Sequence, residues 1–216
     1  MIAVDYAANC NELCLLRDIG LVGSESFGSV ILFGNRSLES MRDIALPSDS
    51  STSNMLMKWI LGKRGLDPKL VPMGPDIESM LEECDGALII GDRALSAAIT
   101  NPDLVRMDLG SEWTKITGLP MVFGVFATRG DSPPNFVNKA RDSMLSSYRI
   151  FLDEESRQSE VISIASQKIA LPKDRVAKYF KSEVSNILDK PSIEGLQIFL
   201  NEVCGLGTGP SWFQSD

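Results

Sequence analysis

The chain has 216 residues, a net charge of −8, an apolar fraction of 44% and a charged fraction of 23%. These values are ordinary for a globular protein that forms one large domain or two small lobes. The negative charge disfavours nucleic acid as a partner, because nucleic acid binds basic faces. No apolar run is long enough for a membrane span, and the start lacks the pattern of a signal peptide.

Cysteine and histidine usage narrow the chemistry further. The four cysteines are scattered, which predicts reduced structural thiols, no metal site and a cytoplasmic location; they are Cys10, Cys14, Cys84 and Cys204. The chain contains no histidine. This absence excludes Ser-His-Asp and Cys-His nucleophiles as well as His-based metal centres. Acid–base chemistry therefore falls to Asp, Glu, Lys, Tyr, water or the substrate itself, and we expect no cofactor.

The first part of the chain predicts one short helix and two strands. We expect the helix within 1–18, a strand over 19–23, a polar turn over 24–28 and a buried strand over 29–33. Ser29 lies where the turn gives way to the second strand. A serine at such a position usually makes a local turn bond, and less often lines a ligand site.

A run of small polar residues, 48–54, separates a strand expected over 43–46 from a helix that ends near 62–65. Ser, Thr and Asp cap helix N-termini, because their oxygens accept hydrogen bonds from the unpaired N–H groups there. The remaining N–H groups and the helix dipole favour a carboxylate or a phosphate. A well-capped surface helix is the simpler interpretation. Because the run is longer than one cap requires, we interpret it as a candidate anion pocket.

Strands and helices then alternate. We expect strands over 70–73 and 86–91, and helices over 76–83 and from Arg93 onward. This alternation predicts an α/β fold with mixed, largely parallel sheets. In such sheets ligands bind beyond the carboxyl ends of strands. The polar run and Gly91-Asp92 both follow such ends, which favours one shared site.

The rest of the chain predicts a change of lobe and then a helical tail. Residues 107–113 lead into a short helix, and the apolar run 121–127 is interpreted as a strand that crosses back between two lobes. Trp113 and Phe123 are interpreted as core residues in preference to ligand-stacking ones. From residue 135 onward the pattern predicts only helices, over 135–152, 154–168, 172–187 and 191–203.

Five segments share their order and spacing with one known family: 27–33, 50–53, 87–95, 108–113 and 117–126. They resemble the chorismate dehydratase family of the futalosine route to menaquinone. The most specific are Ile-Gly-Asp-x-Ala-Leu at 90–95 and Thr-Gly-Leu-Pro at 117–120. Tyr179-Phe180 and 195–199 are similar to the helical tail of that family, so the resemblance covers nearly the whole chain.

The resemblance implies a two-lobed fold like that of type II periplasmic solute-binding proteins, with the ligand between the lobes. Residues 1–44 and 122–216 would form lobe I, and residues 45–121 would form lobe II. It also implies a lyase that removes water from chorismate to give 3-[(1-carboxyvinyl)oxy]benzoate. Nothing in this sequence matches the family's opening, a strand followed by a turn with Asn-x-x-Pro-Leu, so we expect lobe I to be incomplete at its N-terminus.

The resemblance also suggests roles for individual residues. Ser51, Thr52 and Ser53 would bind a substrate carboxylate at the start of their helix, and Ser29 would line the site near the reacting carbons. Asp92 either accepts a hydrogen bond from the ligand or caps the helix that starts at Arg93. With no evident protein base, the enolpyruvyl carboxylate of the substrate would take the ring proton.

Two other functions compete with this interpretation. A non-catalytic protein of the same fold that binds small anions is the main alternative, although the start lacks a signal peptide. The sister enzyme dihydroxynaphthoate synthase has a similar fold but relies on a histidine, which this chain lacks. We expect a small carboxylate as the ligand, neither nucleic acid nor membrane as a partner, and leave a homodimer open.

Overall fold

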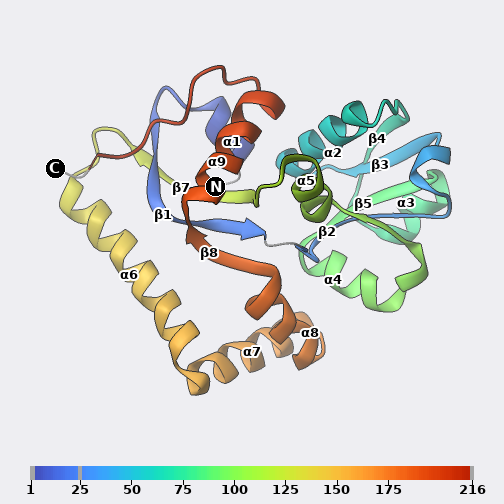
Figure 1. Ribbon diagram of the computed structural model, residues 1–216. Coiled ribbons are helices and arrows are strands. Elements are labelled where there is room, and N and C mark those ends of the chain that lie inside the picture. The colour runs from blue at the N-terminus through green and yellow to red at the C-terminus, as the bar shows by residue number, and fades with distance from the viewer. Residues whose placement is uncertain (1–2, 24–25, 215–216) are drawn as a thin grey trace. The chain divides into compact units, whose positions relative to one another are not determined.

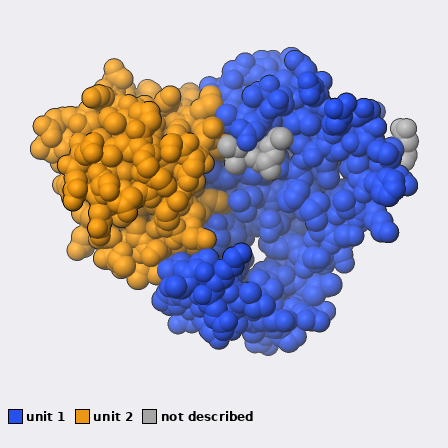
Figure 2. Space-filling model, turned by 180° about the vertical axis from the view of Figure 1, so that it is seen from behind, with its two compact units in different colours: residues 1–24, 119–216 blue, residues 25–118 orange. Residues whose placement is uncertain are grey.

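The computed structural model describes residues 3–23 and 26–214, which form two compact units. Unit 1 comprises residues 1–24 and 119–216, and unit 2 comprises residues 25–118 (Figure 2). The expected turn over 24–28 includes residues 24 and 25, which lie outside the described residues. Within the described part of the chain, no helix is both long enough and apolar enough to cross a membrane.

Unit 2 is built on a five-stranded sheet with the order β4-β3-β5-β2-β6 (Figure 1). Its strands are β2 (Val30–Gly34), β3 (Asp43–Pro47), β4 (Lys69–Met73), β5 (Gly86–Ile90) and β6 (Val105–Asp108). Its helices are α2 (Ser51–Lys63), α3 (Ile77–Glu83), α4 (Gly91–Thr100) and α5 (Leu109–Thr117), with short 3-10 turns at Leu38–Ser40 and Pro102–Leu104. Each helix and strand expected between residues 29 and 113 is present.

Helices cover both faces of this sheet. Helices α3 and α4 pack on the face that carries Ile31, Phe33 and Ile89, with Met80 of α3 and Ala94 of α4 in the same core cluster. Because successive strand residues point to opposite faces, Leu32, Ile44 and Leu88 face the other side, where Figure 1 shows α2 and α5. These two helices meet through Trp59 and Trp113, whose ring centroids are 5.1 Å apart. The continuous burial of β2 and β5 thus follows from helix layers on both sides.

The pairing of the strands is mixed, as predicted, but less parallel than predicted. Strand β3 pairs in parallel with β4 and β5, whereas β2 runs antiparallel to both β5 and β6. The sheet of unit 1 is antiparallel throughout its described pairs. An apolar run does not carry its own direction, since the direction depends on how the chain returns to the sheet.

Unit 1 contains a three-stranded sheet with the order β7-β1-β8. Its strands are β1 (Leu13–Gly23), β7 (Met121–Arg129) and β8 (Val184–Leu188). Its helices are α1 (Ala3–Ala8), α6 (Pro134–Asp153), α7 (Glu155–Ile169), α8 (Lys173–Lys178) and α9 (Lys190–Ile198), with π-helical turns at Tyr179–Glu183 and Phe199–Val203. Helix α6 packs on β1, where Leu145 meets Leu16 and Ile19.

Two predictions for unit 1 are corrected by the structure. The helix expected over 172–187 ends in a π-helical turn, and residues 184–188 form β8 instead. Strand β8 is stabilised by pairing with β1, in which Ile19 lies opposite Ile187. Strand β1 itself begins at Leu13, because Leu13 to Leu15 pair with Ala127 to Arg129 of β7. Both strands depend on partners that are distant in the sequence, which a local pattern does not reveal.

The unit boundaries also differ from the expected lobes, which changed at 44/45 and 121/122. The structure divides the chain at 24/25 and at 118/119. Strand β2, expected in lobe I, lies between β5 and β6 in the sheet of unit 2. Residues 25–44 therefore belong with residues 45–118 in one core.

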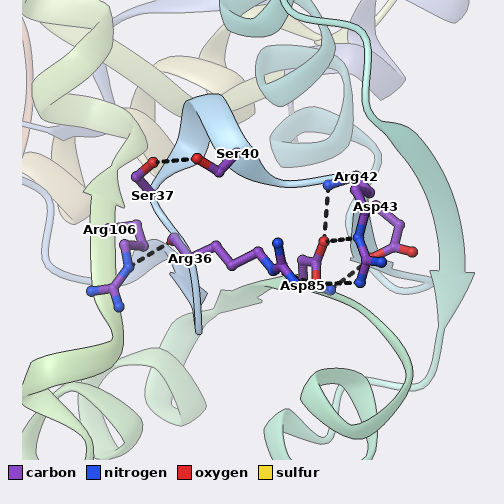
Figure 3. Close-up of polar contacts among 7 residues, drawn as sticks. All are labelled: Arg36, Ser37, Ser40, Arg42, Asp43, Asp85 and Arg106. Carbon is purple, nitrogen blue, oxygen red and sulfur yellow. Dashed lines mark hydrogen bonds and ion pairs between the residues drawn. The ribbon is translucent and has the colours of Figure 1, made fainter.

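An ion cluster holds the edge of the unit 2 sheet at which β3 and β5 begin (Figure 3). The carboxylate of Asp85 accepts hydrogen bonds from the Arg42 backbone N–H at 3.0 Å and from its guanidinium Nε at 2.8 Å. The Nε of Arg36 lies 3.1 Å from the other Asp85 oxygen. The Asp85 N–H in turn donates to Asp43 at 2.7 Å. This network ties together the starts of two neighbouring strands.

Candidate functional site

The opposite edge of the unit 2 sheet brings the predicted site residues together. The register places Val30, the first residue of β2, opposite Ile90, the last residue of β5. It also places Ile31 opposite Asp108, the last residue of β6. Strand β3 runs parallel to β5, so it ends at the same edge. Helices α2, α4 and α5 therefore all begin along one edge, beside the segment that leads into β2 (Figure 1).

Ser29 lies in this edge as a buried residue, with 2% of its surface exposed. Its backbone carbonyl accepts a hydrogen bond of 2.7 Å from the N–H of Gly91. Gly91 has a φ of +65°, a left-handed conformation that glycine adopts without steric cost. The turn from β5 into α4 is thus fixed against the start of β2. Ser29 and Gly91-Asp92, which are far apart in the sequence, are neighbours here.

The polar run forms the start of α2. Ser50 occupies the N-cap position without a capping hydrogen bond from its side chain, and it is 7% exposed. Ser51 is exposed, whereas Thr52 and Ser53 are buried. The N–H of Asn54 donates to the Ser50 carbonyl at 3.3 Å, so the helical ladder begins at Asn54. The preceding N–H groups of a helix have no partner within it, which makes this end suited to an anion.

Asn54 stabilises the approach to this helix. Its side-chain Nδ2 donates to the carbonyl of Pro47, the last residue of β3, at 2.9 Å. The N–H of Ser48 donates to the carbonyl of Met73 at 3.0 Å, which holds the start of the run against the end of β4. Among the described residues the buried Oδ1 of Asn54 has no hydrogen-bond partner. The loop from β3 to α2 is therefore held at both ends.

Asp92 lies in the first turn of α4 and is exposed. The helix starts at Gly91 with Ile90 as its N-cap, so the alternative in which Asp92 caps a helix starting at Arg93 is wrong. The neighbouring Arg93 donates from its guanidinium to the carboxylate of Asp49 at 2.5 Å. This ion pair joins the turn after β5 to the polar run after β3. Sequence reasoning missed it, because the two residues are aligned only by strand pairing.

Asp108 is a second residue whose contribution to the candidate site is not predicted by the sequence. Its carboxylate accepts hydrogen bonds from the N–H groups of Gly28 at 2.6 Å, Phe27 at 3.3 Å and Ser111 at 2.8 Å. It thus caps α5 and positions the segment before Ser29. An Asp immediately before the first residue of a helix is the local signal for the cap. Only the register of β2 and β6 shows its second role.

Trp113 and Phe123 are core residues, as predicted, with 0% and 6% of their surfaces exposed. At the edge itself Ser51 and Asp92 are exposed, whereas Ser29, Thr52 and Ser53 are buried. The N-termini of α2 and α4 bring the positive ends of their dipoles to this edge, whereas the N-terminus of α5 is capped by the carboxylate of Asp108. No group of three or more acidic or thiol side chains in the described residues forms a metal-binding cluster. Hydroxyl groups and helix N-termini at one edge favour an anionic ligand.

A protein-family model described as menaquinone biosynthesis matches residues 3–203. A chorismate dehydratase from Thermus thermophilus is 28% identical over 228 residues, a match that covers 96% of this chain and 79% of that protein. The solved structure of protein AF1704 from Archaeoglobus fulgidus superposes with a TM-score of 0.74 at 22% identity, over 95% of this chain and 78% of that one.

Periplasmic binding proteins share the fold. The aliphatic sulphonate binding protein SsuA from Escherichia coli superposes with a TM-score of 0.63 at 16% identity, over 100% of this chain and 77% of that one. SsuA from Xanthomonas axonopodis, solved with bound MOPS, gives a TM-score of 0.57 at 16% identity, over 97% of this chain and 73% of that one. At such identities the likeness concerns the fold alone. The predicted periplasmic-binding-protein fold is thereby confirmed.

Proposed function

Because the chain belongs to the menaquinone-biosynthesis family, we propose that it is a chorismate dehydratase, a lyase that forms 3-[(1-carboxyvinyl)oxy]benzoate. The relative from Thermus thermophilus that bears this name matches nearly the whole chain. The observation that carries the proposal is the meeting of Ser29 with three helix N-termini at one sheet edge. Such an edge suits a substrate whose charges are carboxylates.

The proposed reaction needs little from the protein beyond position and dipoles. The ring of chorismate loses its hydroxyl group and a ring proton as water, and the ring becomes aromatic. The bond from ring carbon to hydroxyl oxygen breaks, and the electrons of the broken C–H bond enter the ring. The driving force thus lies in the substrate, and an enzyme without histidine accelerates the step by orienting the substrate and stabilising the leaving oxygen.

Each site residue contributes to binding the substrate or to the loss of water. Ser51, Thr52 and Ser53 hold one carboxylate at the start of α2, through the amides and the hydroxyl groups of that turn. Ser29 donates to the departing hydroxyl from the segment before β2. Asp92 accepts from a hydroxyl of the ligand, and the enolpyruvyl carboxylate takes the ring proton. These assignments are supported by the common edge and by the absence of a histidine base.

Replacing Ser29 by alanine tests the proposal. The wild-type chain should convert chorismate to a product lighter by one water, followed by liquid chromatography and mass spectrometry. We expect Ser29→Ala to lower kcat about 100-fold, as does the loss of one preorganised hydrogen-bond donor. Ser96→Ala removes an exposed hydroxyl from α4 and should leave kcat unchanged.

The outcomes separate the two functions that the sequence left open. Equal kcat values for Ser29→Ala and Ser96→Ala would refute the role of Ser29. A wild-type chain that binds chorismate without converting it would instead be a non-catalytic anion-binding member of the family. We further propose a cytoplasmic location, because the four cysteines are free thiols. A homodimer stays a prediction.

A further inference from the structure

The ion pair between Asp49 and Arg93 lies inside the proposed anion site. Asp49 immediately precedes the N-cap Ser50 of α2, and Arg93 belongs to the first turn of α4. The Nη2 of Arg93 lies 2.5 Å from Oδ2 of Asp49, and 49% and 46% of the two side-chain surfaces are exposed. Neither side chain makes another hydrogen bond or ion pair with a residue that the structure describes. The pair is therefore accessible, and its two members are held only by each other.

Positive charge is scarce at this edge, which matters for the binding of a dianion. The turns around the site are 27–29, 48–54, 91–93 and 108–111, and Arg93 is their one basic residue. They also contain three acidic residues, of which Asp108 is bound by backbone amides. The whole chain has a net charge of −8. Within these four turns a ligand with two carboxylates would meet one guanidinium, which the Asp49 carboxylate already binds.

We propose that Asp49 occupies the place of a substrate carboxylate on Arg93, and that a dicarboxylate ligand displaces it on binding. This inference rests on the proposed function, since it concerns the same site. An exposed pair of side chains contributes little stability, so its exchange is not costly. The ligand carboxylate binds Arg93 more favourably than the Asp49 carboxylate does, because it contacts the guanidinium and the N–H groups of the α2 N-terminus together.

The exchange gives the site a selectivity for charge. While Asp49 is bound, Arg93 is neutralised and stays directed toward the polar run. A ligand without an anionic group cannot form an ion pair with Arg93, so it does not displace Asp49. A ligand with two carboxylates places one on Arg93 and leaves the other for the remaining amides and hydroxyls. The pair thus lowers the affinity for every anion while it keeps the guanidinium in position for the correct one.

Neutralising Asp49 in the full chain tests the exchange. We expect Asp49→Asn to lower the KM for chorismate about threefold to fivefold, the scale of an exposed ion pair, with a smaller change in kcat. Arg93→Gln should raise KM about tenfold, because the ligand loses a charge-assisted hydrogen bond. In the double variant the benefit of Asp49→Asn should disappear, since that benefit requires a free guanidinium.

A matched control separates the exchange from a general effect of charge. Asp131→Asn breaks another exposed pair, with Arg129 at 3.0 Å in unit 1, and changes the net charge equally. It should leave KM unchanged. The exchange is refuted if Asp49→Asn and Asp131→Asn give the same KM, or if the effect of Asp49→Asn persists in the double variant.

Equilibrium binding of chorismate by calorimetry distinguishes this inference from the proposed function. If the chain binds chorismate but does not convert it, the proposed function fails. Tighter binding by Asp49→Asn and weaker binding by Arg93→Gln would then still support the exchange. If neither the wild-type chain nor Asp49→Asn binds chorismate, both are refuted.

Discussion

At the scale of single residues, Asp85 shows how a charge stabilises this fold. Hydrogen bonds from the guanidinium and the backbone N–H of Arg42, together with the charge of Arg36, hold the pKa of Asp85 well below its usual range. The ordinary pKa of an aspartate in an unfolded chain is about 3.9. Since the folded-state pKa is the lower one, the carboxylate stabilises the fold above the unfolded-state pKa. That contribution is lost as the pH falls toward the folded-state pKa.

We therefore expect the free energy of unfolding to fall less steeply between about pH 5 and about pH 3 in Asp85→Asn than in the wild type. Urea denaturation followed by circular dichroism at several pH values measures this slope. Asp153→Asn removes a negative charge at the exposed end of α6 and controls for net charge. Parallel curves for Asp85→Asn and the wild type would show that the Arg42 contact contributes nothing.

Asp108 and Arg93 make contacts that their local sequence does not indicate. Both were visible in the sequence as residues near helix starts, and the cap of α5 by Asp108 follows from local spacing alone. Their partners Gly28 and Asp49 are 80 and 44 positions away. Such contacts depend on which strands are neighbours, so no local pattern indicates them.

At the scale of elements, α9 and α2 offer a comparison between two helical glycines. Gly195 of α9 lies against β7, and a Cβ there would overlap the carbonyl oxygen of Pro120. Gly62 of α2 has nothing within 4 Å of such a Cβ. The first glycine is required by close packing, whereas the second only weakens its helix.

We expect Gly195→Ala to lower the free energy of unfolding by about 1–3 kcal/mol, the usual cost of overpacking. Gly62→Ala should raise it by about 0.5–1 kcal/mol, because alanine favours a helix more than glycine does. Urea denaturation of both variants provides the measurement. If Gly195→Ala were as stable as Gly62→Ala, the close approach of α9 to Pro120 would be wrong.

The elements that the sequence predicts well are those with a clear local pattern, even where, as for β2 and β7, their partner strands are distant. The strands and helices of unit 2 follow one another closely, and their caps and apolar periods are local signals. Residues 172–187 carry a helical pattern, which predicts a helix at the place where the structure has β8 paired with β1. The π-helical turn before β8 marks the point where pairing with β1 replaces the helix.

At the scale of the whole molecule, the division at 24/25 and 118/119 predicts an independent folding unit. Residues 26–118 contain a complete five-stranded sheet with helices on both faces. Expressed alone, this segment should unfold cooperatively in urea, with a slope of about 1–2 kcal/mol per molar. Circular dichroism and tryptophan fluorescence should give the same transition.

The segment 45–121, which corresponds to the expected lobe II, is the matched control. It lacks β2, which lies between β5 and β6. Strand β6 then has no neighbouring strand, and the edge of β5 that pairs with β2 is left unpaired. We expect this segment to show no cooperative transition. Equal stability of the two segments would favour the division at 44/45 over the one that the structure gives.

The sequence by itself determined the α/β class, the order of most helices and strands, the family and the polar character of the site. These properties follow from local periodicity, from caps and from motifs such as the one at 90–95. Only the tertiary structure decided the antiparallel place of β2, the strand β8 and the contacts of Asp108 and Arg93. The physical reason is that strand pairing joins backbone groups regardless of their distance along the chain, so it is fixed by the whole fold.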